Sequence, residues 1–328
     1  MGVNVRQERL VAPVLRGPAK WVRRQPRTLL PWALLAVLVT VGSSLSSTFR
    51  SEPVMIETLK GAAFVGMASA AQFFAVVGGG IDLSVGAVAT VSAMFAAVIM
   101  NGHDHSIPLA LLASIGVGLT VGLVNGLVIN LLDVPPFVAT FGMNFILVGA
   151  AFTYSVNPVG RAAPSFYALY TETWGRIPVL LVLLAAFWVV CWYIARQTTF
   201  GRHLYAVGGD REAARLAGVR TTRVSVMSYV TCSVIAALTG MLWLSQTAVG
   251  APDLGATLLL TTVTAVVVGG VSLFGGEGSV IGVLGGALIL AFLSQLFSAL
   301  QINALYQMLV EGLLVLTVLG IYRQNRRA

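Results

Sequence analysis

Ten stretches of mostly apolar residues run through this chain, and they restrict its possible folds more than any other feature. A helix needs about 20 apolar residues to cross the hydrocarbon core of a bilayer. The 328 residues are 57% hydrophobic and only 10% charged, whereas soluble domains carry about 25% charged residues. The composition therefore predicts an all-α, polytopic membrane protein. The expected spans are residues 28–47, 56–77, 83–100, 107–131, 137–156, 178–195, 224–246, 257–273, 277–299 and 303–322, of which 257–273 has the weakest pattern.

Sixteen of the 20 Lys and Arg residues fall into three blocks outside these stretches. Short loops rich in Lys and Arg stay on the cytoplasmic side of a membrane. We therefore expect a basic cytoplasmic segment 1–27, a single transmembrane domain 28–322 with a cytoplasmic loop 196–223, and a basic cytoplasmic tail 323–328. The protein would be multi-pass in the plasma (inner) membrane, surrounded by lipid. The net charge of +8 then marks topology, and no nucleic-acid partner is expected.

A glycine triplet, Gly78 to Gly80, interrupts the apolar sequence between the second and third spans. Consecutive glycines lower helix propensity and permit positive φ, so they should end the second helix. Asp82 can then cap the first turn of the next helix. Irregular backbone at membrane depth is tolerated only where protein or a water-filled cavity covers it. A second interruption, at residues 269–278, would pair with the first along a central pathway.

The central loop contains a short helix signal. Asp210 is a good amino-terminal cap, residues 211–217 have helical spacing, and Gly218 is a natural stop. Ala213, Leu216 and Ala217 would share a small apolar face. Such a short helix is marginal in water and needs a partner, unless the segment is only a solvated loop.

Four motifs in order resemble the permease subunits of ribose, galactose and arabinose type ABC importers. The similarity extends over roughly residues 28–322. The motifs are Gly79-Gly80-Ile81-Asp82-Leu83-Ser84-Val85-Gly86, Val134-Pro135-Pro136-Phe137-Val138-Ala139-Thr140, Thr199-Phe200-Gly201-Arg202-His203-Leu204-Tyr205-Ala206-Val207-Gly208-Gly209 and Val267-Val268-Gly269-Gly270-Val271-Ser272-Leu273-Phe274-Gly275-Gly276.

The resemblance implies an ATP-driven importer of a monosaccharide or related small polar solute. Its other parts would be an ABC ATPase subunit that binds ATP and Mg, an extracytoplasmic sugar-binding protein, and a second permease subunit, identical or different. The chain would not itself be an enzyme. The ATPase-coupling residues would be Gly208, Gly209, Asp210, Ala213, Ala214, Leu216 and Gly218.

This chain also departs from the pattern of that family. Asp210 replaces the usual Asn, and Leu259 and Thr261 stand where relatives usually carry acidic residues. Both Asp and Asn cap helices, so we expect the short helix after residue 210 to form. Without acidic residues at positions 259 and 261, the substrate or the gating detail could differ from that of the family.

Polar residues within the apolar stretches are the candidates for a solute pathway. Amides there either fasten helices together or bind sugar hydroxyls, and fastening is the more general use. The candidates are Gly79, Gly80, Asp82, Ser84, Gln72, Asn125, Asn144 and Gln295. Gly118, Gly122 and Gly126, and likewise Gly278, Gly282 and Gly286, recur every four residues and predict close helix packing.

Other chemistry lacks its sequence signals. Lys20 and Lys60 are the only lysines, and neither belongs to a phosphate-binding loop. His103, His105 and His203 lack metal-binding spacing, and no serine-nucleophile elbow occurs, so no catalytic or metal site and no cofactor of this chain's own are expected. Glu311 lies within the last apolar stretch, where a carboxylate could relay protons. A proton-coupled secondary transporter and a purely structural membrane anchor therefore remain alternatives.

Overall fold

The computed structural model describes residues 26–303, 306–307, 309–310 and 312–313. Residues 1–25 of the expected amino-terminal segment, most of the tenth expected span including Glu311, and the tail 323–328 lie outside these residues. The predicted all-α class is confirmed. Within the described part of the chain, the only strands are two of two residues each, which pair as an antiparallel hairpin.

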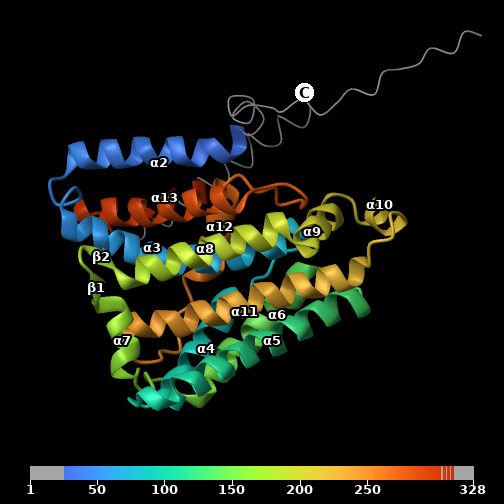
Figure 1. Ribbon diagram of the computed structural model, residues 1–328, viewed down its shortest axis with the longest axis horizontal. Coiled ribbons are helices and arrows are strands. Elements are labelled where there is room, and N and C mark those ends of the chain that lie inside the picture. Colours follow the sequence, from blue (N-terminus) through green and yellow to red (C-terminus); the bar gives the residue numbers. More distant parts are fainter. Residues whose placement is uncertain (1–25, 304–305, 308, 311, 314–328) are drawn as a thin grey trace, which may run out of the picture.

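Membrane-length helices run side by side in a bundle (Figure 1). Seven stretches of the described chain are long and apolar enough to cross a membrane, and they agree with the expected spans to within a few residues. The helices are α2 (Pro26–Leu45), α3 (Glu52–Val77), α5 (Ile107–Leu131), α6 (Pro136–Tyr154), α8 (Val179–Gln197), α11 (Thr221–Thr247) and α13 (Val280–Ala299).

Short elements lie at the two ends of this bundle (Figure 1). One end carries α9 (Thr199–Gly209) and α10 (Arg211–Leu216); the other carries α7 (Pro164–Thr171) and the hairpin of β1 (Thr173–Trp174) and β2 (Ile177–Pro178). A 3₁₀ turn, Asp104–Ser106, precedes α5. The loop 157–177 is thus partly structured, and the loop 196–223 holds two helices where the sequence predicted one.

The two most buried membrane helices are α3 and α11, which form the middle of the fold. The faces of α2 and α6 instead expose large apolar side chains, among them Val37, Phe145 and Ile146. Apolar exposure of this extent suits lipid or a neighbouring membrane subunit. Polar side chains buried around α3 and α11 therefore lie in the protein interior.

The expected span 257–273 is wrong in length. Helix α12 (Leu258–Val268) has only 11 residues, so it is roughly 16 Å long and cannot cross a bilayer. The preceding residues 250–257 enter the bundle without helical structure, and Gly255 N–H donates to Thr90 Oγ1 at 2.9 Å. This segment contains Pro252 and two glycines, which disfavour helix. Its partner α4 (Val85–Met100) is also short, at 16 residues.

Glycines of α5 confirm the predicted close packing. A Cβ atom on Gly118, Gly122 or Gly126 would lie 2.5–2.9 Å from a Cα atom of α11, so α5 and α11 touch backbone to backbone. The second trio is only partly right. Gly282 and Gly286 pack in this way on the end of α12, but α13 begins at Val280, so Gly278 precedes the helix.

Candidate functional site

The two helix breaks end with the same backbone geometry. Helix α3 closes with Gly79 N–H bonded to Val76 O and Gly80 N–H bonded to Ala75 O, both at 3.0 Å. Helix α12 closes with the matching pair from Gly270 and Val271, at 3.0 and 3.1 Å. Gly79 and Gly270 both have left-handed backbones, with φ of 88° and 85°, as this helix-ending motif requires. The sequence pairing of the two breaks therefore corresponds to a shared local structure.

The two breaks also meet in space, together with the end of α9. Gly276 N–H donates to Val77 O at 3.0 Å. A Cβ atom on Gly208 would lie 1.8 Å from that same oxygen, and one on Gly275 would lie 2.8 Å from the Gly79 Cα. We call this contact of Val77, Gly79, Gly208, Gly275 and Gly276 the glycine junction. Because only backbone atoms fit there, α9 is in direct contact with both helix breaks.

A polar cluster surrounds the first break. Asp82 is 1% exposed, and its Oδ1 accepts from Ser84 N–H at 2.8 Å and from Ser84 Oγ at 2.5 Å. Asn125 Nδ2 donates to Ser84 Oγ at 3.0 Å. The amide of Gln72, oriented to satisfy both its groups, donates to Asp82 O at 2.8 Å and accepts from Asp82 N–H at 3.3 Å. Thr140 Oγ1 accepts from Leu83 N–H at 3.1 Å.

The predicted capping role of Asp82 needs correction. Helix α4 begins at Val85, and Ser84 occupies the cap position without a capping side-chain bond. Asp82 instead bonds the cap residue itself, two positions ahead, in a tight turn. The Asp82 carboxylate therefore orders the residues just before α4. It does not cap the first-turn N–H groups of that helix.

Helix α11 covers the other side of this cluster. The side chains of Cys232 and Ser233 lie next to the Asp82 carboxylate, whose Oδ2 has no hydrogen-bond partner among the described residues. A Cβ atom on Gly80 would lie 1.9 Å from the Tyr229 hydroxyl, so glycine lets the ring reach the break. The cluster is closed to solvent here, and its bonds join α3, α4, α5 and α6.

Replacing Asp82 tests whether its acceptor or its charge matters. Asn keeps an oxygen for Ser84 N–H, whereas Ala removes it at a cost of about 0.5–2 kcal/mol, by analogy with lost caps. We expect Asp82→Asn to keep a near-normal melting temperature and Asp82→Ala to lower it. Thermal unfolding of the two purified variants provides the measurement. An equal loss of stability in both variants would show instead that the charge is required.

Two predicted pathway residues lie apart from this cluster. Asn144 on α6 lines a hollow of about 260 Å³ together with Thr90 and Asp253, which we call the Asn144 hollow. Gln295 is half-buried on α13, a helix that packs on α2, α3 and α12. The structure thus joins Gln72, Asp82, Ser84 and Asn125 by hydrogen bonds, and no such bond connects Asn144 or Gln295 to them within the described residues.

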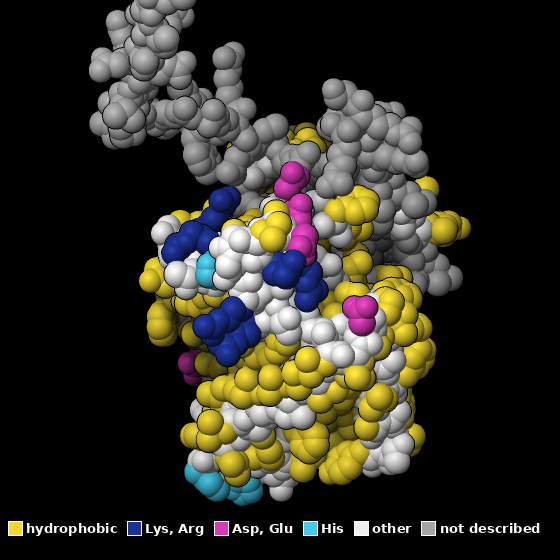
Figure 2. Space-filling model, turned by 90° about the vertical axis from the view of Figure 1, so that its right-hand side faces the viewer, with side chains coloured by type: hydrophobic (Ala, Val, Ile, Leu, Met, Phe, Trp, Pro, Cys, Tyr) yellow, Lys and Arg dark blue, Asp and Glu magenta, His cyan; other side chains and the backbone are white. Residues whose placement is uncertain are grey.

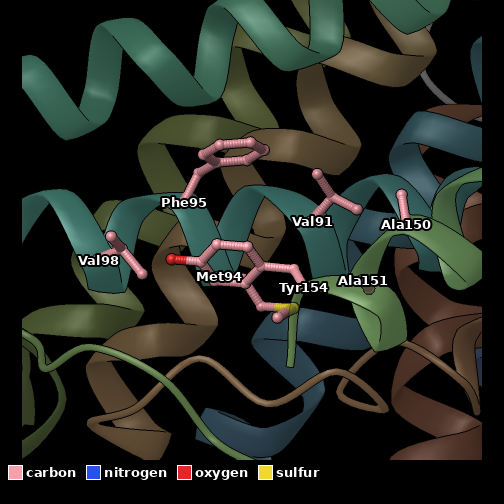
Figure 3. Close-up of a pocket in the computed structure, with 7 residues that line it drawn as sticks. All are labelled: Val91, Met94, Phe95, Val98, Ala150, Ala151 and Tyr154. Atoms are coloured by element: carbon pink, nitrogen blue, oxygen red, sulfur yellow. The ribbon is translucent and has the colours of Figure 1, made fainter. Parts of the chain in front are cut away.

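A second hollow, of about 280 Å³, lies between the outer parts of α4 and α6. Val91, Phe95 and Val98 project from α4, and the Tyr154 ring lies beside Met94 (Figure 3). Its lining is apolar except for the Tyr154 hydroxyl. Both this hollow and the Asn144 hollow are lined by residues of α4 and α6, but the Asn144 hollow is also lined by Pro252, Asp253 and Gly255 of the segment before α12.

The short helix α10 forms as the sequence predicts. Asp210 Oδ1 accepts from Ala213 N–H at 2.9 Å, and Gly218 follows the helix with φ of 84°. Ala214 is buried, whereas Leu216 is 75% exposed. Arg215 pairs with Glu212 at 2.6 Å, and this partner lowers the Glu212 pKa below its ordinary value.

Basic side chains gather at this end of the bundle (Figure 2). All six arginines of the loop 196–223 are exposed. Arg211 is held by Asn130 at the end of α5, whose Oδ1 lies 2.6 Å from the guanidinium. The exposed face of Ala213, Leu216 and Ala217 therefore stands in a basic surface. In the described residues, no group of three or more His, Cys, Asp or Glu side chains could hold a metal ion.

Paired helix breaks within a bundle of membrane-length helices occur in many membrane transport proteins. Residues 54–319 match the family described as the branched-chain amino acid transport system / permease component. The chain therefore belongs to that family of permeases.

Curated relatives align over most of their length. The fructose import permease protein of Rhizobium meliloti is 34% identical over 306 residues, which are 90% of this chain and 84% of that protein. The ribose import permease protein of Bacillus subtilis is 32% identical over 302 residues, 90% of this chain and 92% of that protein. The D-allose transport system permease protein of Escherichia coli is 26% identical over 292 residues, 88% and 90% of the two chains. No solved structure matches this chain.

Proposed function

We propose that this chain is the permease subunit of an ABC importer for a monosaccharide. The family is one of transport permeases, and relatives named for fructose, ribose and allose import cover about nine tenths of the chain. The exposed basic end would face the cytoplasm, since Lys and Arg are retained there. Both termini would lie on that side, and α7 with its hairpin would face an extracytoplasmic sugar-binding protein.

ATP and Mg would be bound by a separate ATPase subunit that docks on α10. The observation that supports this proposal best is the glycine junction, because it joins the α9–α10 segment to both helix breaks. A displacement of α10 by the docked subunit would be transmitted through Gly208 to the ends of α3 and α12. Backbone contacts suit this role, since they lack flexible side chains that could absorb the movement.

The solute pathway would lie between two permease subunits. Both hollows are open in the single chain beside α4 and α6, so a second subunit packed there would enclose them. Gly79, Gly80, Asp82 and Ser84 would act from behind these hollows, by fixing the start of α4. Alternating access would then follow from movement of the two breaks.

The apolar face of α10 provides a direct test. Ala213 is exposed next to Leu216, so Ala213→Asp should fold normally yet place a charge in the docking contact, at a cost of several kcal/mol if the charge is buried unpaired. We expect the variant to reach the membrane but to lose co-purification with the ATPase subunit and solute-stimulated ATP hydrolysis. Ala213→Ser, which changes the same exposed position without adding a charge, is the matched control. Full ATPase stimulation in Ala213→Asp would contradict docking at α10.

Competition for uptake identifies the substrate class. Cells expressing the complete system should take up a labelled monosaccharide, and unlabelled ribose, fructose or allose should compete with it. A branched-chain amino acid such as leucine should not. Competition by leucine alone would reject the monosaccharide and favour the solute that the family description names.

A further inference from the structure

The Asn144 hollow is lined by an amide side chain that forms no hydrogen bond within the described part of the chain. Asn144 is 9% exposed, and it lines the hollow. Unlike Gln72 and Asn125, which bond to the Asp82 cluster, Asn144 is available to a ligand.

A carboxylate lies in the same hollow. Asp253 lines it, is exposed, and forms no ion pair with any described residue. Its depth follows from its neighbours along the chain. Gly250 packs on Met94 and Gly255 on Gly86, so Asp253 lies alongside the middle of α4. Acidic side chains within a membrane bundle line water-filled cavities or contact other polar groups, so water or a polar solute suits this hollow better than a lipid chain.

The segment that carries Asp253 is anchored to α4. Thr90 Oγ1 accepts from Gly255 N–H at 2.9 Å and lies 3.1 Å from Gly86 O. A Cβ atom on Gly86 or Gly255 would lie 2.0–2.3 Å from the other residue's backbone oxygen. The backbone two residues from Asp253 therefore has little freedom to move. Such anchoring presents the carboxylate at a defined place beside Asn144, as a binding site requires.

We propose that Asn144 and Asp253 bind the hydroxyl groups of the solute during its passage. A carboxylate accepts two hydrogen bonds, and an amide donates and accepts, which matches the adjacent hydroxyls of a monosaccharide. Phe152 also lines the hollow and offers an apolar surface to the C–H face of a sugar ring. The volume of about 260 Å³ is near the lower limit of small-molecule sites, which favours one sugar ring over a disaccharide.

This inference rests on the proposed function and goes further by assigning residues to solute selection. Loss of a hydrogen bond to a charged group weakens binding by roughly tenfold or more. We therefore expect Asp253→Asn and Asn144→Ala each to raise the KM for monosaccharide uptake about tenfold, with unchanged membrane level. The matched control is Asp133→Asn, an exposed carboxylate in the loop before α6, which should leave the KM unchanged.

A labelling experiment gives a readout that does not depend on turnover. Cys191 and Cys232, both buried, are first replaced by Ser or Ala. A cysteine at position 253 should then react with a water-soluble maleimide, and the transported monosaccharide should slow that reaction. A cysteine at position 133 should show no protection.

The outcomes separate this site from the proposed function. Monosaccharide uptake by the wild type with an unchanged KM in both variants, or with no protection at position 253, overturns the site alone. Protection by a metal cation and not by the sugar also overturns it, because the carboxylate would then be a cation site. Absence of uptake of every monosaccharide by the wild-type complex overturns the proposed function and this site with it.

Discussion

Gly208→Ala is expected to abolish ATP-driven uptake. The added Cβ atom would lie 1.8 Å from Val77 O and 2.7 Å from Gly276 N, two backbone atoms that share the hydrogen bond of the glycine junction. Neither atom can rotate away as a side chain could, so α9 must separate from the ends of α3 and α12. Overpacking typically costs about 1–3 kcal/mol, and occasionally more.

Gly209→Ala is the matched control for this prediction. A Cβ atom there would approach nothing closer than the Gly276 Cα, at 3.9 Å, which is an ordinary contact. ATP hydrolysis and uptake should be measured together in the assembled complex. We expect Gly208→Ala to retain subunit assembly but to lose uptake at least tenfold, with Gly209→Ala near wild type. Equal activity of the two variants would show that the junction does not transmit movement.

Gly122→Ala is expected to destabilise the whole bundle. Its Cβ atom would lie 2.5 Å from the Val230 Cα and 2.7 Å from Tyr229 O, so α5 would be pushed away from α11. Small residues permit such close approach of membrane helices, and α11 is a central helix of this fold. The displacement would also disturb the bond between Asn125, on the next turn of α5, and Ser84.

Gly116→Ala provides the comparison on the same helix. Nothing lies within 4 Å of the Cβ atom that it would add, and Ala has the higher helix propensity. Melting temperature in detergent and yield of folded protein should fall markedly for Gly122→Ala and stay level or rise for Gly116→Ala. A small effect of Gly122→Ala would mean that α5 and α11 adjust more readily than their backbone contact indicates.

Local patterns predicted much of this fold. Apolar length located the membrane-length helices, and Asp210 with Gly218 located α10, because helix ends depend on neighbours in the chain. The prediction of a full span at residues 257–273 is wrong because these residues form a continuous apolar run, although only Leu258–Val268 is helical. Whether residues 250–257 continue the helix depends on the Thr90 and Gly86 contacts, which are distant in sequence.

The site was predicted in parts and not as a whole. The sequence indicates Gln72 and Asn125 because amides inside apolar helices bind partners, and Asp82 and Ser84 because they follow the glycine break; the structure joins all four by hydrogen bonds. The place of Gly208 in the glycine junction could not be predicted, since it follows from the packing of three segments far apart in the chain. Asp253 was missed because it precedes the apolar run and resembles an ordinary loop residue.

Reconstitution with purified partners tests the central claim most directly. The permease, its ATPase subunit and the sugar-binding protein are placed in sealed vesicles, and labelled monosaccharide uptake is measured with ATP or with a proton gradient supplied separately. We expect uptake that requires ATP, the ATPase subunit and the binding protein, and that is unaffected by the proton gradient alone. Uptake by the permease alone, driven by a proton gradient without ATP, would contradict an ATP-driven mechanism.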